Sequence, residues 1–237
     1  MGLLCTSITI IPAVQTANST VRIVAASPST IADSSITATS AAAVLYMHAE
    51  LEQHGLSKEA FEYAWKGYQY LLERKMISRR NYLTVCDFSQ SSKQKRLYII
   101  DVENSELLIN TYVAHGKNSG AEYANSFSNT PESLQSSLGF FITANTYTGE
   151  HGLSLRINGV DPGYNDKALT RSIVIHGAAY VDAARANNGM YMGRSWGCPA
   201  VPQKESAKII TTIKNGTCLF IYHPSRTYLQ RSKILNG

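Results

Sequence analysis

The sequence has little charge and no dense basic region. Charged residues make up 16% of the 237 residues, and 22 Lys and Arg against 17 Asp and Glu give a formal net charge of +5. The basic residues are scattered, and the local clusters Arg79-Arg80 and Lys93 to Arg96 are short. Proteins that bind nucleic acid concentrate basic residues on one face. We therefore expect no nucleic-acid partner and only a mild preference for anionic polymers.

Cysteine is also scarce, which excludes a disulfide-rich scaffold. The four cysteines are Cys5, Cys86, Cys198 and Cys218, and no CxxC pair occurs among them, so neither a zinc ribbon nor a thioredoxin-like motif is present. A single disulfide between Cys86 and Cys218 stays open as an alternative. The six histidines form no HxxxH or HxH pair. We therefore expect no metal site and no zinc peptidase.

Long apolar runs are missing as well. After the N-terminus no segment approaches the roughly 18 consecutive apolar residues of a membrane helix, so we expect no stable membrane span. The run MGLLCTSITIIPAVQTA is apolar, but it lacks a basic region, is shorter than a membrane span and contains Pro12. Small polar residues follow it. We interpret residues 1–40 as a leader or linker that includes a poor or truncated signal sequence.

Residues 41–78 carry two helical patterns. The run AAAVLYMHAELEQHG ends at Gly55, and Ser57 stands where it can cap a second helix. In that second helix, apolar residues recur at three- and four-residue spacing through about Arg74. Such a helix has a single apolar stripe that needs a larger partner. We expect a helical hairpin that packs on the outside of the following domain.

Residues 79–224 alternate short β-type runs with turns. The runs are YLTVCDF, RLYIIDV, LLINTYVAH, GFFITA, LSLRI, SIVIH and CLFIYH. Two long polar loops, 116–137 and 158–171, separate the later runs, and loops of this length are often functional. A helix is predicted at about 203–214, and residues 225–237 form a tail. This order predicts a mainly β (α+β) fold, either a twisted sandwich or a barrel-like sheet.

The segment RSWGCPAVP places a thiol in a constrained turn. Gly197 allows the backbone to approach closely, and Pro199 stiffens the turn. Pro202 stands where a following helix would begin, so we expect Cys198 near the positive end of that helix. A cysteine is a nucleophile only as thiolate, which such surroundings favour.

The run SIVIH ends in His176, which Gly177 follows. A histidine at the junction of a buried strand and a loop is held firmly and still reaches a site, which suits a general base. The structural alternatives are a core cysteine and a hydrogen-bonded core histidine. A glycine-flanked cysteine together with such a histidine favours catalysis. Cys86 and Cys218 stand in apolar strand patterns without a special turn, so we expect them in the core.

The pair IHG and SWGCPAV resembles the signature of the L,D-transpeptidase (YkuD-type) catalytic domain, in which a histidine precedes a Ser/Thr-His-Gly-Cys core. The resemblance is strongest to the murein subgroup with a Ser-Trp-Gly-Cys-Pro core. It extends over roughly residues 43–224, through HGLSKEAFEYAWKGY, VCDFSQSSKQKRLYIIDVE, VAHGKNSG, FSNTPESLQSSLGFFIT and GEHGLSLRINGVDPGYND. It implies a barrel-like transpeptidase fold and a cofactor-free enzyme that acts on peptidoglycan stem peptides in the periplasm or cell wall. We expect a monomer.

The resemblance also implies catalytic roles. Cys198 would attack the third residue of a tetrapeptide stem, release the terminal D-alanine and form a thioester. An amine of a second stem would then resolve the thioester into a cross-link. His176 would carry the proton, with its ring oriented by the carbonyl of Gly177. If water resolves the thioester instead, the same site is a carboxypeptidase or endopeptidase.

The motif residues around the nucleophile have implied roles too. Ser195 would brace the turn, and the backbone N–H groups of Trp196, Gly197 and Cys198 would stabilise the oxyanion. Trp196 stands where most of the superfamily has a second histidine, and Ala200 stands where Asn or Arg is usual. These two departures put recognition of the stem by the motif itself in question.

Substrate binding is predicted for a wider set of polar residues. The candidates are His115, His151, Arg156 and Arg194, and for each of them loop hydrogen bonding or surface solvation is an equal alternative. A further alternative for the whole protein is a cell-wall-binding module that keeps the groove without turnover. Rapid alkylation of Cys198 at neutral pH would favour an enzyme over such a module.

Overall fold

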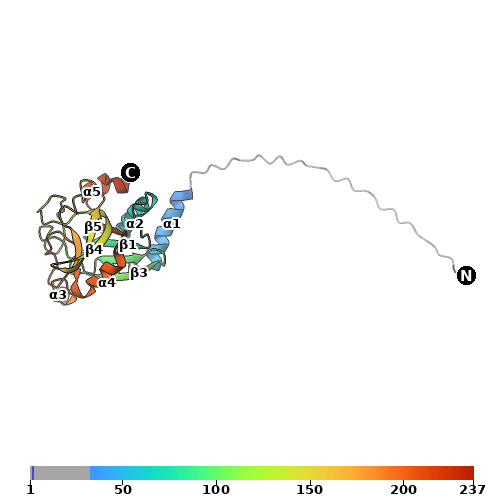
Figure 1. Ribbon diagram of the computed structural model, residues 1–237. Helices are drawn as coiled ribbons and strands as arrows, with labels where there is room; N and C mark the ends of the chain where they lie inside the picture. The colour runs from blue at the N-terminus through green and yellow to red at the C-terminus, as the bar shows by residue number, and fades with distance from the viewer. Residues whose placement is uncertain (1, 3–32) are drawn as a thin grey trace.

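The computed structural model describes residue 2 and residues 33–237 (Figure 1). Most of the predicted leader, including Cys5, therefore lies outside the described residues. No helix in the described part of the chain has the length and apolar composition needed to cross a membrane. The helices are α1 (Asp33–His48), α2 (Lys58–Glu73), α3 (Ala183–Asn187), α4 (Gln203–Ile213), α5 (Arg226–Arg231) and α6 (Lys233–Asn236). The strands are β1 (Tyr82–Asp87), β2 (Leu97–Asp101), β3 (Glu106–Thr111), β4 (Gly139–Gly149), β5 (Gly152–Gly159), β6 (Val174–Ala178), β7 (Ala200–Pro202) and β8 (Cys218–Tyr222).

The strands form one sheet in the order β3-β2-β1-β8-β4-β5-β6-β7. The last strand, β8, lies in the middle, parallel to β1 and antiparallel to β4. Just after β3, Ala114 pairs with Ala200 of β7, so the chain that leaves one edge of the sheet reaches the other edge. The sheet is therefore nearly closed, and the expected mainly β, barrel-like fold is confirmed.

Each of the seven predicted β-type runs contains a strand, and the predicted helix is α4. The strand that the sequence did not indicate is β7, which has only three residues, Ala200–Pro202. A segment of this length shows no alternation of polar and apolar residues. Its pairing with β6 and with Ala114 makes it a strand, and both contacts are tertiary.

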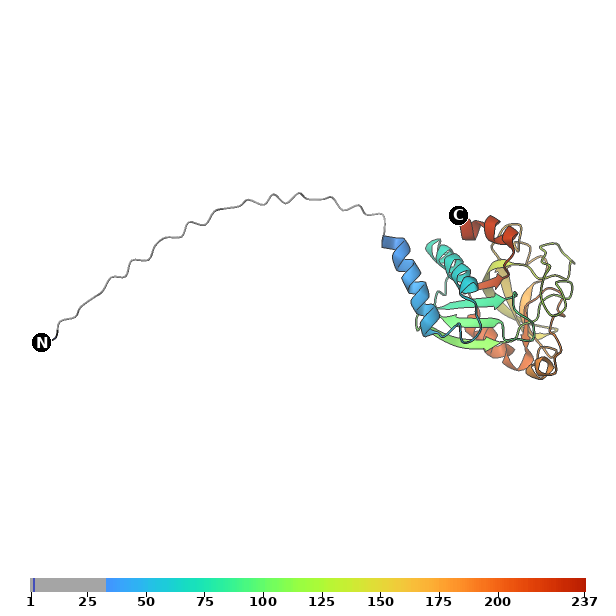
Figure 2. The ribbon, with the colours of Figure 1, turned by 180° about the vertical axis from the view of Figure 1, so that it is seen from behind.

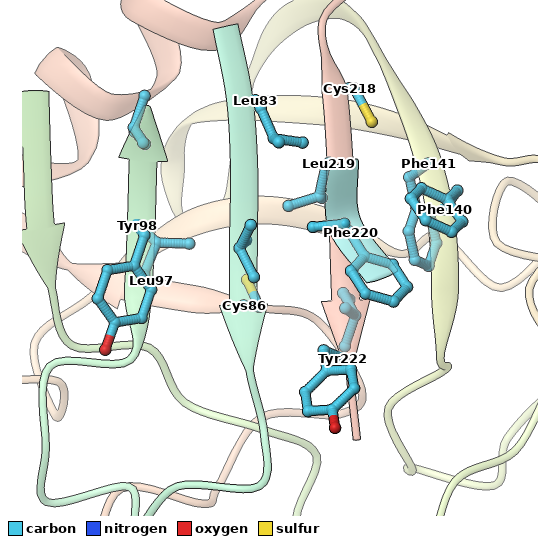
Figure 3. Packing of buried hydrophobic residues seen from close by; sticks show 14 of the residues in the cluster. Leu83, Cys86, Leu97, Tyr98, Phe140, Phe141, Cys218, Leu219, Phe220 and Tyr222 are labelled. Carbon is cyan, nitrogen blue, oxygen red and sulfur yellow. The ribbon is translucent and has the colours of Figure 1, made fainter. Parts of the chain in front are cut away.

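The core of the sheet lies around β8, in which every residue is buried. Figure 3 shows Phe140 of β4 and Phe220 of β8 side by side, and their rings stack with centroids 4.1 Å apart. All five residues of β2 are buried too. Burial on both faces explains why these strands read as continuous apolar runs rather than as alternating patterns.

The two core cysteines do not form the disulfide that the sequence left open. Cys86 pairs with Ile221, and Cys218 pairs with Leu83, so the thiols are three positions out of register on neighbouring strands. At about 3.3 Å per residue this offset is about 10 Å, beyond the reach of a disulfide. The odd offset also places the side chains on opposite faces of the sheet. Both cysteines are buried and free, as expected for core residues.

The predicted helical hairpin lies outside the sheet. The hydroxyl of Ser57 accepts the N–H of Ala60 and so caps α2, which ends one residue before the predicted Arg74. The buried stripe of α2 faces β1 and β8. Figure 2 shows α1 and α2 together on one side of the sheet, whereas α4 lies against β5, β6 and β7.

The residues predicted as a tail form α5 and α6, and a buried carboxylate holds them in place. Asp161, in the loop after β5, accepts hydrogen bonds from the N–H of Phe140 at 2.8 Å, the hydroxyl of Tyr228 at 2.9 Å and the hydroxyl of Ser232 at 2.6 Å. Burial raises the pKa of Asp161, and these donors oppose that effect. One side chain thus joins β4, the loop before β6 and the C-terminal helices.

We predict that Asp161→Ala lowers the free energy of unfolding by about 3 kcal/mol, because several buried donors lose their acceptor at once. Urea denaturation of the full chain measures the effect. Asp166→Ala is the matched control, since Asp166 lies on the same loop but makes its hydrogen bonds at the surface. We expect the control to change stability by less than about 1 kcal/mol. Equal losses for the two variants would contradict the assignment.

Candidate active site

Cys198 and His176 line one cavity with a volume of about 850 Å³. The sheet brings them together, because His176 in β6 pairs in parallel with Ala200 of β7, two residues beyond Cys198. The cavity is completed by the β4–β5 hairpin, by residues 171–174 and by residues 177–180. The pair that the sequence singled out therefore shares a single solvent-accessible space.

His176 is oriented by the carbonyl that follows it. Its Nδ1 lies 2.9 Å from the oxygen of Gly177. Because a carbonyl oxygen only accepts, Nδ1 carries the hydrogen in the neutral ring, and Nε2 keeps its lone pair. Burial lowers the pKa of His176, the Gly177 carbonyl opposes this, and a charge on His151 lowers the pKa further. A buried, neutral imidazole with a free Nε2 can accept a proton.

The first turn of α4 lies directly behind Gly177. A Cβ at this position would lie 2.7 Å from Oε1 of Gln203 and 2.7 Å from Oγ of Ser206. Gln203 is the first residue of α4 and also lines the cavity. The start of α4 is thus held against the strand that carries the histidine.

Cys198 is half-buried, and its sulfur faces the backbone that enters β6. The N–H of Val174 lies 3.5 Å from Sγ, and the carbonyl of Ser172 lies 3.7 Å from it. Burial raises the pKa of the Cys198 thiol, while the Val174 N–H and the charge of Arg171 lower it. Because burial is the largest effect, the thiol needs a base to remove its proton.

The turn before Cys198 is braced by Ser195. The Ser195 hydroxyl donates to the carbonyl of Cys198 at 2.6 Å and accepts the N–H of Gly197 at 3.2 Å. Gly197 has a φ of +119°, and a Cβ there would lie 2.7 Å from the carbonyl oxygen of Gln135. Only glycine fits this backbone without strain. The N–H groups of Trp196 and Cys198 make no hydrogen bond to another described residue, whereas that of Gly197 is engaged.

The comparisons with known proteins agree with the motif. A family model for the L,D-transpeptidase catalytic domain matches residues 52–222, most of the chain. The chain belongs to this family. The comparison with curated proteins found no match.

Several solved structures resemble the chain at low identity. An L,D-transpeptidase from Mycobacterium smegmatis is 13% identical over 60% of this chain and 59% of that chain, with a TM-score of 0.38. The L,D-transpeptidase of Xylanimonas cellulosilytica is 15% identical over 65% and 68%, with a TM-score of 0.35. The helical cell shape determining protein of Campylobacter jejuni is 12% identical over 68% and 57%, with a TM-score of 0.40. The match thus spans less than two thirds of the Mycobacterium smegmatis and Campylobacter jejuni chains.

The four residues predicted to bind substrate in this transpeptidase domain lie in different places. His151 and Arg194 line the cavity. Arg156 is not among the lining residues, and its guanidinium lies over the ring of Tyr147, 4.3 Å from the centroid. His115 is fully buried and does not reach the cavity. The structure therefore brings two of the four to the cavity that Cys198 lines.

Trp196, at the position of the second family histidine, is exposed. It lines the cavity mouth with 74% of its surface accessible. The ammonium group of Lys117 lies 5.7 Å from the centroid of its ring. The Trp196 side chain thus offers an aromatic surface in the cavity that Cys198 lines.

Arg171 lines the cavity and connects the two long loops, a role for which the sequence offers no signal. Its guanidinium donates to the carbonyls of Ser128 and Gln135, both at 2.6 Å, and to the hydroxyl of Ser133 at 3.2 Å. The carbonyl of Gly197 in turn accepts the Ser136 hydroxyl at 3.2 Å. The first long loop therefore supports the cysteine turn directly.

His115 forms a buried support beneath the cysteine turn. Nη2 of Arg96 lies 2.7 Å from Nδ1 of His115, and Nε2 lies 3.2 Å from the carbonyl of Gly120. A guanidinium only donates, so Nδ1 accepts and Nε2 carries the hydrogen. Burial and the charge of Arg96 lower the pKa of His115 to about 4. The His115 backbone carbonyl accepts the N–H of Ser195 at 3.1 Å.

We predict that His115 makes the fold acid-sensitive. Its pKa is lower in the folded chain than the ordinary 6.5, so the unfolded chain takes up the proton first. The stability from neutral His115 is present above pH 6.5 and is lost as the pH falls toward 4, by about 3 kcal/mol. Urea denaturation between pH 7 and pH 4 should show a shallower acid loss for His115→Asn, while exposed His54→Asn behaves like the wild type. Identical pH dependence in His115→Asn would refute the assignment.

We also predict that Arg171→Gln slows alkylation of Cys198 at neutral pH by about three- to tenfold, because a cation that stabilises the thiolate is lost. Iodoacetamide rates between pH 6 and pH 10, with mass mapping of Cys198, measure the effect. Arg171→Lys keeps the charge but loses several hydrogen bonds of the guanidinium. We expect its Cys198 alkylation rate to lie between the rates of the wild type and of Arg171→Gln. An unchanged pH dependence in a folded Arg171→Gln variant would show that the charge has no such role.

Proposed function

We propose that this chain is a peptidoglycan L,D-transpeptidase of the murein subgroup with a Ser-Trp-Gly-Cys-Pro core. The observation that carries the proposal is the cavity shared by Cys198 and a neutral His176 whose Nε2 is free. Membership of the L,D-transpeptidase family supports peptidoglycan as the substrate. We likewise propose action in the periplasm or cell wall, as a monomer.

The first half of the reaction forms a thioester. Nε2 of His176 takes the proton from Sγ of Cys198, and the sulfur attacks the carbonyl carbon between the third residue of a tetrapeptide stem and its terminal D-alanine. The N–H groups of Trp196 and Cys198 are the open donors for the oxyanion, whereas that of Gly197 is held by Ser195. As the C–N bond breaks, His176 returns the proton to the departing D-alanine amine.

The second half transfers the acyl group. The amine of a second stem attacks the thioester carbon, His176 accepts the amine proton, and the C–S bond breaks. The thiolate then regains a proton from His176, so the enzyme returns to its starting state and one new amide bond joins the stems. Each bond that breaks is replaced by one of the same type, and the steps need no oxidant, reductant or cofactor.

The cavity charges suit a stem peptide. Arg171 and Arg194 line the cavity, and Glu150 carries the one carboxylate among the described lining residues. The positively charged arginine side chains attract the carboxylates of a stem peptide. Exposed Trp196 adds an apolar surface at the same rim.

The deciding experiment is mass spectrometry of disaccharide-tetrapeptide after incubation with the full chain. We expect a dimer with loss of D-alanine, no product from Cys198→Ala, and at least about a hundredfold lower rate for His176→Gln. Cys5→Ala, which removes a cysteine outside the motif, should retain full activity.

The other outcomes select the alternatives. Tripeptide without dimer would replace the transpeptidase with a carboxypeptidase or endopeptidase that uses the same pair of residues. Absence of both product and acyl-enzyme, with sacculus binding retained, would leave a non-catalytic wall-binding module.

A further inference from the structure

A second imidazole lies on the proposed base. His151 stands in the turn between β4, which ends at Gly149, and β5, which begins at Gly152. Its ring stacks on that of His176, with centroids 4.3 Å apart and planes inclined by 21°. His151 is exposed and His176 is buried, so the pair lies at the boundary between solvent and the cavity wall. One face of the His176 ring is therefore covered by a titratable group.

The sheet determines this contact. Ser154 of β5 pairs with His176 of β6, and His151 precedes Ser154 by three residues. The hairpin closes at the pair Gly149 and Gly152, which leaves His151 in the two-residue turn beyond the sheet. The fixed register of β5 on β6 therefore carries His151 over the His176 ring.

The stacked pair also restricts protonation. Two imidazolium rings at about 4 Å repel each other, so a charge on one ring opposes a charge on the other. Burial lowers the pKa of His176, and a charge on His151 lowers it further.

Other charged groups face the same space. Arg171 and Arg194 line the cavity from the loops before β6 and β7, and Glu150 lies beside His151 in the hairpin turn. The remaining titratable groups among the described lining residues are those of Cys198, Tyr147 and Tyr180. Of this set, His151 has the direct ring contact with His176.

We propose that His151 is a positioning residue for His176: its ring covers and orients the His176 imidazole and, when protonated, keeps it in the neutral form. This inference rests on the proposed function only in that His176 is the base of the transfer. It assigns to the β4–β5 hairpin a second histidine that the Ser-Trp-Gly-Cys turn lacks.

The test is the titration of His176 by NMR of the histidine Cε1–H groups in the full chain, which needs no substrate. His151→Gln removes both the cover and the charge, so we expect the pKa of His176 to rise by about 0.5 or more. His151→Phe keeps an aromatic cover without the charge, and we expect a smaller rise. His54→Gln, at an exposed histidine outside the cavity, is the control and should leave the titration of His176 unchanged.

A second readout is the pH profile of kcat/KM on disaccharide-tetrapeptide. A higher pKa of His176 moves the acidic limb to higher pH in His151→Gln, whereas a purely structural defect lowers the rate without moving the limb. An unmoved His176 titration in folded His151→Gln would overturn the inference, and a His151→Phe titration equal to the wild type would overturn the role of the charge. If the wild type forms no product, the proposed function fails, and the NMR titration still decides the role of His151.

Discussion

The structure depends on the backbone pairing that closes the sheet beside the cysteine. The N–H of Ala114 donates to the carbonyl of Ala200 at 2.8 Å, and the N–H of Lys117 donates to the carbonyl of Ser195 at 2.7 Å. These bonds join the chain after β3 to the Cys198 turn and to β7. Without them β7 would lack its partner on one side, and the Cys198 turn would lose its attachment to the rest of the sheet.

Polar groups buried beneath this closure keep it rigid. Arg96 is fully buried, and its guanidinium donates to backbone carbonyls and to Nδ1 of His115. The backbone carbonyl of His115 accepts the N–H of Ser195. Arg171 performs the corresponding task at the surface by tying the two long loops together. Buried polar networks are stable only when every member is paired. The first long polar loop thus supplies a hydrogen bond to the turn, from the Ser136 hydroxyl to the Gly197 carbonyl.

The electrostatics of the site favour a neutral resting pair. Burial raises the pKa of Cys198 and lowers that of His176, so burial favours the uncharged form of both the thiol and the imidazole. Stacked His151 belongs to the same arrangement, because a charge on its ring lowers the pKa of His176.

The sequence by itself indicated seven of the eight strands and the Ser57 cap. It also indicated the core positions of Cys86 and Cys218 and singled out Cys198 and His176, because each of these features lies in a local pattern or motif. Tertiary structure alone decided that β7 is a strand and that Arg171 reaches the cavity. It also decided that, of the four candidate binding residues, His151 and Arg194 line the cavity, whereas His115 supports the turn. Their positions depend on which segments pair across the sheet. Such long-range pairing has no signature in the residues next to them along the chain.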